Sequence, residues 1–507
     1  MRYSSDMTLL LVLFGLGVGT EVALPWLGRW RRAQETLAAG SLMLTAFASG
    51  GLVMWRINLW SVLILLGSIY RIVNCLRVVE GRMHPAYLRA AVRRTTLALV
   101  GFQAAAAGSW WAWQVWQVTD RTAWTLLCAA QLLGAGVLAV STARRLRRTA
   151  WPRTASTFAD AELPTLSVAI PARNETEDLQ ACLESLVQST YPKLEILVLD
   201  DCSQTRRTPE IIRSFAHDGV RFVEGTPPKP GWLPKNQAYD QLLRESSGEY
   251  VLFSGVDARF TPDSLRQLVT TLLGKRKLMM SILPWRAEGA ERRLAVVQAM
   301  RYLWELAPPR RLFRRPPVLS TCWIARKDEL ARAGGFVAVA RAIVPEAHFA
   351  KALAKQNDGY SFMRANEHVG IESTKPAKEQ FDTAVRMRYP QLHRRPESVL
   401  LLALAYDLFL LVPFIVVTAG PWLAAGVFAR TLAAAAVTLL TVTYLSVALV
   451  TRTGSPWAGL MALPVGLAYD LILLHISMWK YEFSVVDWKG RNVCIPAMHV
   501  IPHLPKL

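Results

Sequence analysis

The stretch YVLFSGVDARF, residues 250–260, runs from a strand-like segment directly into a single aspartate, Asp257. Burying a carboxylate at the end of a strand costs free energy unless another group satisfies its charge. The stretch therefore predicts a buried strand that presents Asp257 to a ligand. The segments on either side of it indicate the kind of sheet to which this strand belongs.

Strand-like and helix-like segments alternate ahead of this stretch. The apolar strand-like segments are LSVAIPA (166–172), LEILVLDD (194–201) and VRFVE (220–224). The segments with helical spacing are EDLQACLESLVQ (177–188), TPEIIRSFA (208–216) and PKNQAYDQLLRE (234–245). Repeated strand–helix units predict an α/β domain, Rossmann-like, with a mostly parallel sheet and helices on both faces.

Polar side chains follow these strands where each one ends. They are Arg173, Asn174, Glu175, Asp200, Asp201 and Asp257. Ligands of such sheets bind at the carboxyl ends of the strands. We therefore expect all six side chains along one rim of the sheet.

The composition points to a membrane protein. Hydrophobic residues make up 52% of the 507 residues, yet the formal net charge is +20. This combination is typical of apolar spans joined by basic loops. The arginines cluster beside the apolar runs and form no single soluble stripe, which argues against a nucleic-acid partner. No C-x-x-C pair, H-E-x-x-H motif or P-loop is present.

Apolar runs flank the α/β region on both sides. Five precede it, at 7–27, 38–55, 59–76, 95–117 and 123–143, and three follow it, at 398–419, 431–451 and 456–478. Each is close to the ~20 residues that span a bilayer. The first contains Glu21 and Pro25 and is the weakest candidate.

These runs predict four regions. They are an N-terminal transmembrane region (1–150), the α/β domain (151–395), a C-terminal transmembrane region (396–480) and a tail (481–507). Basic loops such as RRLRR (144–148) place the α/β domain in the cytoplasm of a multi-pass plasma-membrane protein. The side on which the tail lies stays open.

The last apolar runs contain a short internal repeat, LAYDLFLL (404–411) and LAYDLILL (467–474). An aspartate in a span is costly, and one interpretation of the repeat is a pair of carboxylates that face a shared polar cavity. The alternative is a coincidence in a sequence rich in leucine and alanine, with each aspartate near an interface or paired to an arginine.

Residues 160–395 resemble a membrane-bound family-2 glycosyltransferase, a nucleotide-sugar-dependent enzyme of the GT-A fold. The resemblance rests on the order and spacing of several motifs. They are IPARNE (170–175), VLDDCS (198–203), GWLPKNQA (231–238), FSGVDARFTPDSL (253–265), GGF (334–336), VPEAHFAKAL (344–353) and, in the tail, WKGR (488–491).

The resemblance implies a role for each candidate residue. The nucleotide-sugar-binding candidates are Pro171, Asn174, Glu175, Asp200, Asp201, Lys235 and Arg388. Asp257 lies where the family's D-x-D motif lies, and it would hold Mg²⁺ or Mn²⁺ between itself and the donor diphosphate. Glu346 occupies the position of the catalytic base, with His348 as the second candidate. Direct displacement by the acceptor would invert the anomeric centre.

Three departures from the family pattern qualify this reading. Gly255 replaces the first aspartate of D-x-D, and Thr205 replaces an acidic residue in the second motif. The Q-x-x-R-W motif of processive synthases is incomplete, because VRMRY (385–389) begins with valine.

These features predict a metal-dependent hexosyltransferase of the cell envelope. It would move a single sugar from a nucleotide sugar, UDP-linked by expectation, to a lipid or lipid-linked acceptor. The segment 284–317, rich in arginine, tryptophan and proline, is expected to meet lipid headgroups. The alternatives are a processive polysaccharide synthase, an inactive membrane scaffold that keeps the fold, and, less in keeping with the large α/β region, a transporter.

Overall fold

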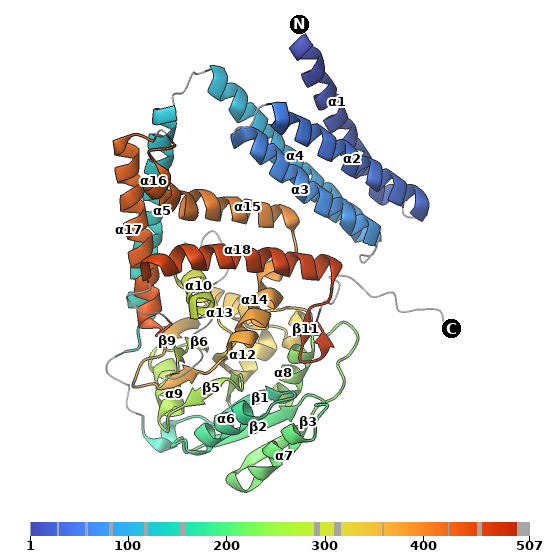
Figure 1. Ribbon diagram of the computed structural model, residues 1–507. Helices are drawn as coiled ribbons and strands as arrows, with labels where there is room; N and C mark the ends of the chain where they lie inside the picture. The colour runs from blue at the N-terminus through green and yellow to red at the C-terminus, as the bar shows by residue number, and fades with distance from the viewer. Residues whose placement is uncertain are drawn as a thin grey trace.

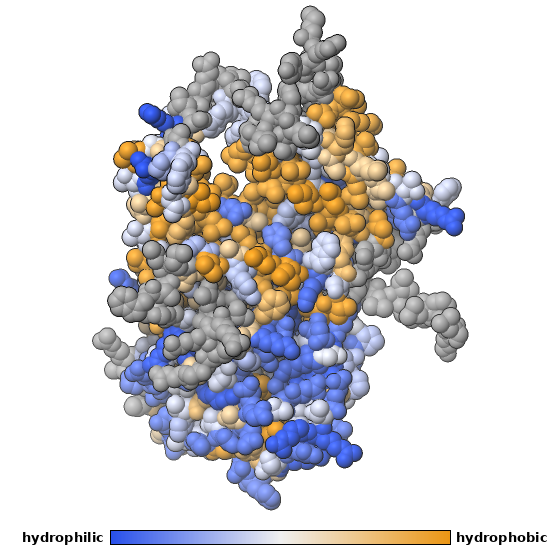
Figure 2. All heavy atoms as spheres, viewed as in Figure 1, coloured by the Kyte–Doolittle hydropathy of each residue, from blue (hydrophilic) through white to orange (hydrophobic). Residues whose placement is uncertain are grey.

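The computed structural model describes residues 2–27, 30–55, 59–80, 85–115, 120–152, 158–287, 295–308, 316–356, 359–423, 425–453 and 459–493. An α/β domain forms one end of the molecule and long helices form the other (Figure 1). Hydrophilic residues dominate the visible surface of the α/β domain, and hydrophobic residues dominate that of the helices (Figure 2).

A seven-stranded sheet forms the centre of the α/β domain. Its strands are β1 (Leu166–Ala172), β2 (Leu194–Asp200), β3 (Val220–Glu224), β4 (Tyr250–Ser254), β6 (Met279–Leu283), β8 (Cys322–Arg326) and β9 (Tyr360–Arg364). They lie in the order β3-β2-β1-β4-β8-β6-β9, and β8 alone runs antiparallel to its neighbours. The mostly parallel sheet predicted from the sequence is confirmed.

Helices cover the sheet and create a core on each face. The helices of this domain include α6 (Glu177–Val187), α7 (Arg207–Ser214), α8 (Pro234–Glu245), α9 (Ser264–Gly274), α12 (Lys327–Arg332) and α13 (Pro345–Lys355). Successive strand residues point to opposite faces, so Leu252 enters one core and Phe253 the other. Phe253 stacks on Trp323 with ring centroids 4.2 Å apart. This aromatic core supports the face on which α8 lies.

The fourth strand is shorter than its apolar pattern suggests, because it leaves the sheet before reaching Asp257. The Gly255 amide donates to the Thr321 carbonyl at 2.9 Å, and the chain then turns into β5 (Ala258–Phe260). A second sheet pairs β5 with β10 (Ile371–Ser373), which also pairs with β7 (Trp285–Arg286). In this register Ser373 lies opposite Ala258, next to Asp257 in sequence.

Long helices precede and follow the α/β domain along the chain. Those before it are α1 (Arg2–Ala23), α2 (Arg31–Trp55), α3 (Leu59–Glu80), α4 (Pro85–Val115) and α5 (Asp120–Arg148). Those after it are α15 (Pro396–Tyr406), which continues through Asp407–Leu411 into α16 (Val412–Ala419), then α17 (Val427–Val450) and α18 (Gly459–Phe483).

Within the part of the chain that the structure describes, five stretches of helix are long and apolar enough to cross a membrane. They are Leu59–Val79, Arg121–Arg148, Pro396–Ala419, Val427–Val450 and Ala462–Phe483. In Figure 1, α5 runs beside α17, whereas α15 and α18 cross the molecule between α1–α4 and the α/β domain. The region before the α/β domain therefore contains two of these stretches, α3 and α5, among its five helices.

Glu21, which weakened the first apolar run as a predicted span, is buried in an ion pair. Its Oε2 atom lies 2.8 Å from Nε of Arg71 on α3. Its Oε1 atom accepts hydrogen bonds from Asn74 at 3.1 Å and from Thr96 at 2.6 Å. A buried carboxylate needs such partners, so Glu21 links α1 to α3 and α4.

Two elements connect the helical region to the sheet rim. Helix α14 (Ala377–Gln391) packs against α18, where the Ser477 hydroxyl accepts from the Tyr389 amide at 3.0 Å. After α18 the chain returns to the α/β domain as a hairpin of β11 (Asp487–Trp488) and β12 (Arg491–Asn492). The tail therefore reaches the carboxyl ends of β1 and β2.

Candidate functional site

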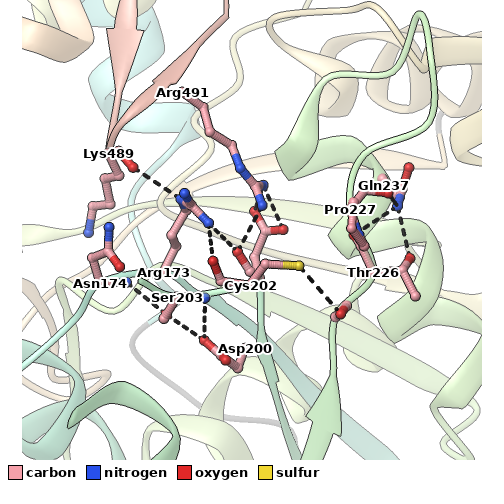
Figure 3. A network of polar contacts seen from close by, with 12 residues as sticks. Arg173, Asn174, Asp200, Cys202, Ser203, Thr226, Pro227, Gln237, Lys489 and Arg491 are labelled. Atoms are coloured by element: carbon pink, nitrogen blue, oxygen red, sulfur yellow. Dashed lines mark hydrogen bonds and ion pairs between the residues drawn. The ribbon is translucent and has the colours of Figure 1, made fainter. Parts of the chain in front are cut away.

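The ends of β1 and β2 form the first part of the site (Figure 3). The Asn174 amide donates to the Ser203 hydroxyl at 2.9 Å, and the Gln204 amide donates to the Asn174 side chain at 2.8 Å. The Ser203 amide in turn donates to Asp200 at 3.3 Å. Asn174 and Cys202 have left-handed backbones, with φ of 49° and 51°. These turns bring Asn174 and Asp200, both predicted to bind the donor, to one rim.

The C-terminal hairpin supplies cations to the two other acidic residues of this rim. Nη1 of Arg491 donates to both carboxylate oxygens of Asp201, each at 2.7 Å. Lys489 forms an ion pair with Glu175, and its carbonyl accepts from Arg173 at 3.0 Å. Arg173 also donates to the Asp201 carbonyl at 2.7 Å. These two predicted nucleotide-sugar-binding acids are thus neutralised by a segment about 290 residues further along the chain.

Burial dominates the electrostatics of these acids. Burial raises the pKa of Glu175, and the charge of Lys489 opposes that rise. Burial likewise raises the pKa of Asp201, and the hydrogen bond and charge of Arg491 oppose it. Pro171, the remaining candidate on β1, is half-buried and pairs in register with Leu199 of β2. It shapes the strand end and offers no backbone donor.

Asp257 lies beside the second sheet and is buried. Ser373 donates to its Oδ2 atom at 3.3 Å, and the Thr374 amide donates to its carbonyl at 2.9 Å. A Cβ atom on Gly255 would lie 2.5 Å from the Oδ1 atom of Asp257. Any side chain at position 255, including the family's aspartate, would therefore require the Asp257 carboxylate to move.

The ligands around Asp257 suit a metal ion whose coordination the substrate would complete. Within the described ranges, no three or more His, Cys, Asp or Glu side chains gather as a metal cluster. The Oδ1 atom of Asp257 accepts no hydrogen bond from any residue that the structure describes. A single carboxylate with a free oxygen fits Mg²⁺ or Mn²⁺ only where phosphate oxygens provide further ligands.

A pocket lined by cations adjoins Asp257. Its lining includes Arg301 and Tyr302 of α10 (Ala295–Leu306), Ser373, Lys375 and Arg388. Ser373 belongs both to this pocket and to the hydrogen bonds of Asp257. Burial lowers the pKa of Lys375, and the nearby charge of Asp257 opposes that change. Three basic side chains next to one carboxylate form a setting that favours a phosphorylated ligand.

The predicted donor-binding residue Arg388 has a protein partner on α18. It forms an ion pair with Asp470, whose other oxygen accepts from the Tyr406 hydroxyl at 2.6 Å. Tyr406 belongs to the first LAYD repeat and Asp470 to the second, so one repeat contacts the other. The second aspartate is thus paired to an arginine. Among the described residues, Asp407 of the first repeat forms no ion pair, and no hydrogen bond joins the two carboxylates.

Lys235 and Glu346 approach each other around Tyr239. The ammonium of Lys235 lies over the Tyr239 ring, 5.1 Å from its centroid. Burial lowers the pKa of Lys235 to about 8, while the charge of Glu346 opposes the fall. Burial together with the charges of Glu346 and Asp257 raises the pKa of Tyr239. Tyr239 therefore links the candidate base, the candidate metal ligand and the candidate phosphate-binding lysine.

The local sequence explains how Glu346 is held. It lies in the first turn of α13, after Pro345, and its side chain is fully buried. A carboxylate is favoured at a helix N-terminus. The side chain of Asn236 on α8 donates to the carbonyls of Val339 and Ala342, at 2.7 and 2.8 Å. This fixes the start of α8 to the segment that leads into α13.

His348, the alternative base, is exposed and faces away from this cluster. Its Nε2 atom lies 3.1 Å from the Ala333 carbonyl, at the end of α12. The geometry groups Glu346, and not His348, with Lys235 and Tyr239.

Five basic or amide residues of the site were missed by the sequence reasoning: Asn236, Arg301, Lys375, Lys489 and Arg491. The motif WKGR did signal the last two, although no role followed from the motif alone. Arg301 and Lys375 lie in segments with no motif, and only the fold brings them beside Asp257.

The fold and this rim are those of an α/β domain with a ligand site at the carboxyl ends of its strands, and comparison with known proteins shows which family this domain resembles. Residues 167–332 match the family model described as glycosyl transferase family 2. This part of the α/β domain is therefore similar to family-2 glycosyltransferases.

Curated relatives match part of the chain. The chain is 28% identical over 186 residues to the probable glycosyltransferase YdaM of Bacillus subtilis, a match that covers 34% of this chain and 43% of the relative. It is 34% identical over 116 residues to the glycosyltransferase AglE of Haloferax volcanii, covering 22% and 36%. The chain thus matches less than half the length of these relatives.

Two solved structures are similar at low identity. The mannosyltransferase PcManGT of Pyrobaculum calidifontis, in complex with GDP-Man and Mn²⁺, is 20% identical with a TM-score of 0.42, covering 70% of this chain and 99% of that one. The glucosyl-3-phosphoglycerate synthase of Mycobacterium tuberculosis, in complex with Mn²⁺, UDP-glucose and phosphoglyceric acid, is 19% identical with a TM-score of 0.31, covering 48% and 86%.

Proposed function

We propose that the protein is a membrane glycosyltransferase that moves one sugar from a nucleotide sugar to a lipid or lipid-linked acceptor, with inversion. The observation that carries this proposal is the position of Asp257. Its carboxylate lies in the turn between β4 and β5, in the domain that matches the family-2 model, next to a pocket lined by Arg301, Lys375 and Arg388. A diphosphate would meet both a metal-binding oxygen and fixed positive charge there.

The rim around β1 and β2 supports nucleotide binding. Asn174 and Asp200 lie together, and Glu175 and Asp201 are held next to them by the tail. Amide and carboxylate oxygens accept hydrogen bonds from ribose hydroxyls and from the N–H edge of a base such as uracil. We therefore propose a UDP-linked donor whose nucleoside lies at this rim and whose diphosphate points toward Asp257.

A divalent cation, Mg²⁺ or Mn²⁺, would be held by Asp257 and would neutralise charge on the leaving diphosphate. The chain's own cations would share that work, since Lys235 and Lys375 belong to the same site. Glu346 would accept the proton of the acceptor hydroxyl. Attack by that hydroxyl on the face opposite the diphosphate would form the new glycosidic bond and invert the anomeric carbon.

The lipid acceptor is supported by the surroundings of the site. Arg388 and Arg301 lie on helices that contact α18, one of the helices long enough to cross a membrane. Basic loops next to the apolar runs support a cytoplasmic position for the α/β domain in the plasma membrane. Of the segment 284–317, expected to meet headgroups, residues 288–294 and 309–315 lie outside the described residues. In the described part, Trp304 stacks on Tyr406 of α15, with ring centroids 4.8 Å apart.

The binding of UDP to the purified full-length protein tests the site without knowledge of the acceptor. We expect calorimetric binding of UDP with Mn²⁺ that chelator weakens, and we expect Asp257→Asn to lose this metal dependence. Asp240→Asn is the matched control, because Asp240 pairs with Arg244 on the outer part of α8. Equal UDP binding with and without metal in the wild type would contradict the assignment of Asp257.

A second candidate function is an inactive scaffold, favoured by Gly255 in place of an aspartate. A scaffold would bind UDP without consuming a nucleotide sugar. Release of UDP from labelled donor by membranes that contain the wild type, and its loss in Asp257→Asn, separates the two functions.

A further inference from the structure

An open groove runs between α5 and α17, away from the sheet rim. It encloses about 770 Å³. Its apolar lining includes Leu133, Val137 and Val140 of α5 and Leu439 of α17, and Arg144 and Arg148 lie at one end. It shares no lining residue with the pocket beside Asp257. The groove therefore calls for an explanation other than donor binding.

The apolar side of the groove faces outward. Leu133, Val137 and Val140 are 72%, 48% and 49% exposed. They recur at helical spacing, and the same stripe continues four and eight residues beyond Val140 into Arg144 and Arg148. Helix α5 is among those long and apolar enough to cross a membrane. A stripe of this kind suits acyl chains better than water.

The charges of the two arginines at the end of the stripe are free to bind a ligand. Arg144 and Arg148 are exposed, and neither forms a hydrogen bond or ion pair with any residue that the structure describes. Arg145 between them behaves differently, since it donates to the carbonyls of Leu306 and Pro308, at 3.0 and 3.1 Å. Arginines beside a bilayer attract anionic headgroups.

We propose that this groove binds an anionic phospholipid of the bilayer as a non-reacting ligand. One acyl chain would lie along Leu133, Val137 and Val140, and the phosphate would meet Arg144 and Arg148. The match of an apolar groove to a chain, and of two available cations to a phosphate, supports this occupant.

The contacts of Arg145 connect the groove to the site. Arg145 satisfies carbonyls at the C-terminal end of α10, where backbone acceptors lack helical partners. The same helix carries Arg301 and Tyr302, which line the pocket beside Asp257. A lipid that holds the end of α5 in place would therefore also fix the position of α10. The lipid acts through α10 and has no contact with the reacting atoms.

Native mass spectrometry of the full-length protein, titrated with phosphatidylglycerol or phosphatidylcholine, tests this site. We expect the wild type to retain phosphatidylglycerol and to prefer it over phosphatidylcholine. The double variant Arg144→Gln/Arg148→Gln should bind phosphatidylglycerol roughly thirtyfold more weakly, because each basic residue near an anionic surface contributes separately. Arg147→Gln is the control, since Arg147 is exposed but does not line the groove.

Three results would overturn the proposal. They are equal retention of both lipids by the wild type, unchanged retention by the double variant, and the same loss in Arg147→Gln as in the double variant. Recovery of phosphatidylglycerol bearing an added sugar would instead assign the groove to the acceptor and refute a non-reacting lipid. All substitutions lie at exposed positions, and thermal unfolding in detergent should confirm that each variant is folded.

Discussion

Arg491 donates to both carboxylate oxygens of Asp201, each at 2.7 Å. This contact attaches the C-terminal hairpin to the end of β2. The helix just before the hairpin, α18, holds Arg388 through Asp470. One helix and its following hairpin therefore contact both parts of the site, the nucleoside rim and the cation-lined pocket.

The Arg491–Asp201 pair is buried, so breaking it should be costly. The side chains are 14% and 5% exposed. Arg491→Gln leaves a buried carboxylate without its cation, and we expect the free energy of unfolding to fall by about 3 kcal/mol. Chemical denaturation in detergent measures this loss.

The pair formed by Arg221 and Glu245 gives the matched control for that loss. These side chains are 47% and 42% exposed, so Arg221→Gln should change the free energy of unfolding by less than about 1 kcal/mol. Equal losses in the two variants would show that the tail does not stabilise the rim.

Glu346→Gln should abolish turnover while keeping donor binding. Loss of a positioned base lowers kcat by about 10²–10⁴-fold, whereas an amide of the same shape preserves the packing of α13. The measurement is the rate of sugar transfer at saturating donor, beside the dissociation constant for UDP.

His348→Ala is the companion variant, because His348 contacts the Ala333 carbonyl and faces away from Lys235. It should retain most of the wild-type rate. A larger loss in His348→Ala than in Glu346→Gln would assign the base to the histidine.

Substitutions of the two LAYD aspartates should lower the free energy of unfolding by very different amounts. Asp470→Asn removes the carboxylate that partners buried Arg388, and we expect about 3 kcal/mol less stability together with weaker UDP binding. Asp407→Asn removes no ion pair among the described residues, so its effect should stay below about 1 kcal/mol. Thermal and chemical unfolding of both variants would detect the contrast. Equal effects would favour a shared role for the two carboxylates.

From the lowered pKa of Lys235 we expect activity to fall and stability to rise as the pH increases. Its pKa in the folded protein is about 8, below the ~10.4 of an unfolded lysine. As pH rises through about 8, the folded protein loses the charge that would attract the diphosphate, so kcat/KM for the donor should fall. Between about 8 and ~10.4 the unfolded chain binds more protons, so the contribution of Lys235 to stability should rise.

Lys235→Arg tests this assignment, because arginine stays charged throughout this range. The variant should lose the alkaline fall in kcat/KM that the wild type shows. An unchanged fall in Lys235→Arg would assign the titration to another group.

The sequence predicted the first four strands and the rim, because apolar strands and the polar residues that follow them are local patterns. It could not predict the partners of Asp201 or Arg388. Those contacts join positions 290 and 82 residues apart, and only the tertiary fold brings them together. Asp257 was predicted from its position after a strand, whereas Lys375 and Arg301 follow no motif. Their place beside Asp257 depends on β10 and α10, which the strand–helix pattern did not cover.

Analysis of the products distinguishes transfer of one sugar to a lipid from synthesis of a polymer. Membranes that contain the wild-type protein would receive a panel of labelled nucleotide sugars with Mn²⁺, and the products would be separated into organic-extractable and water-soluble fractions. We expect label in an organic-extractable species with one added sugar, absent from membranes that contain Asp257→Asn. Label in a water-soluble polymer of high molecular weight would contradict single transfer to a lipid and would identify a processive synthase.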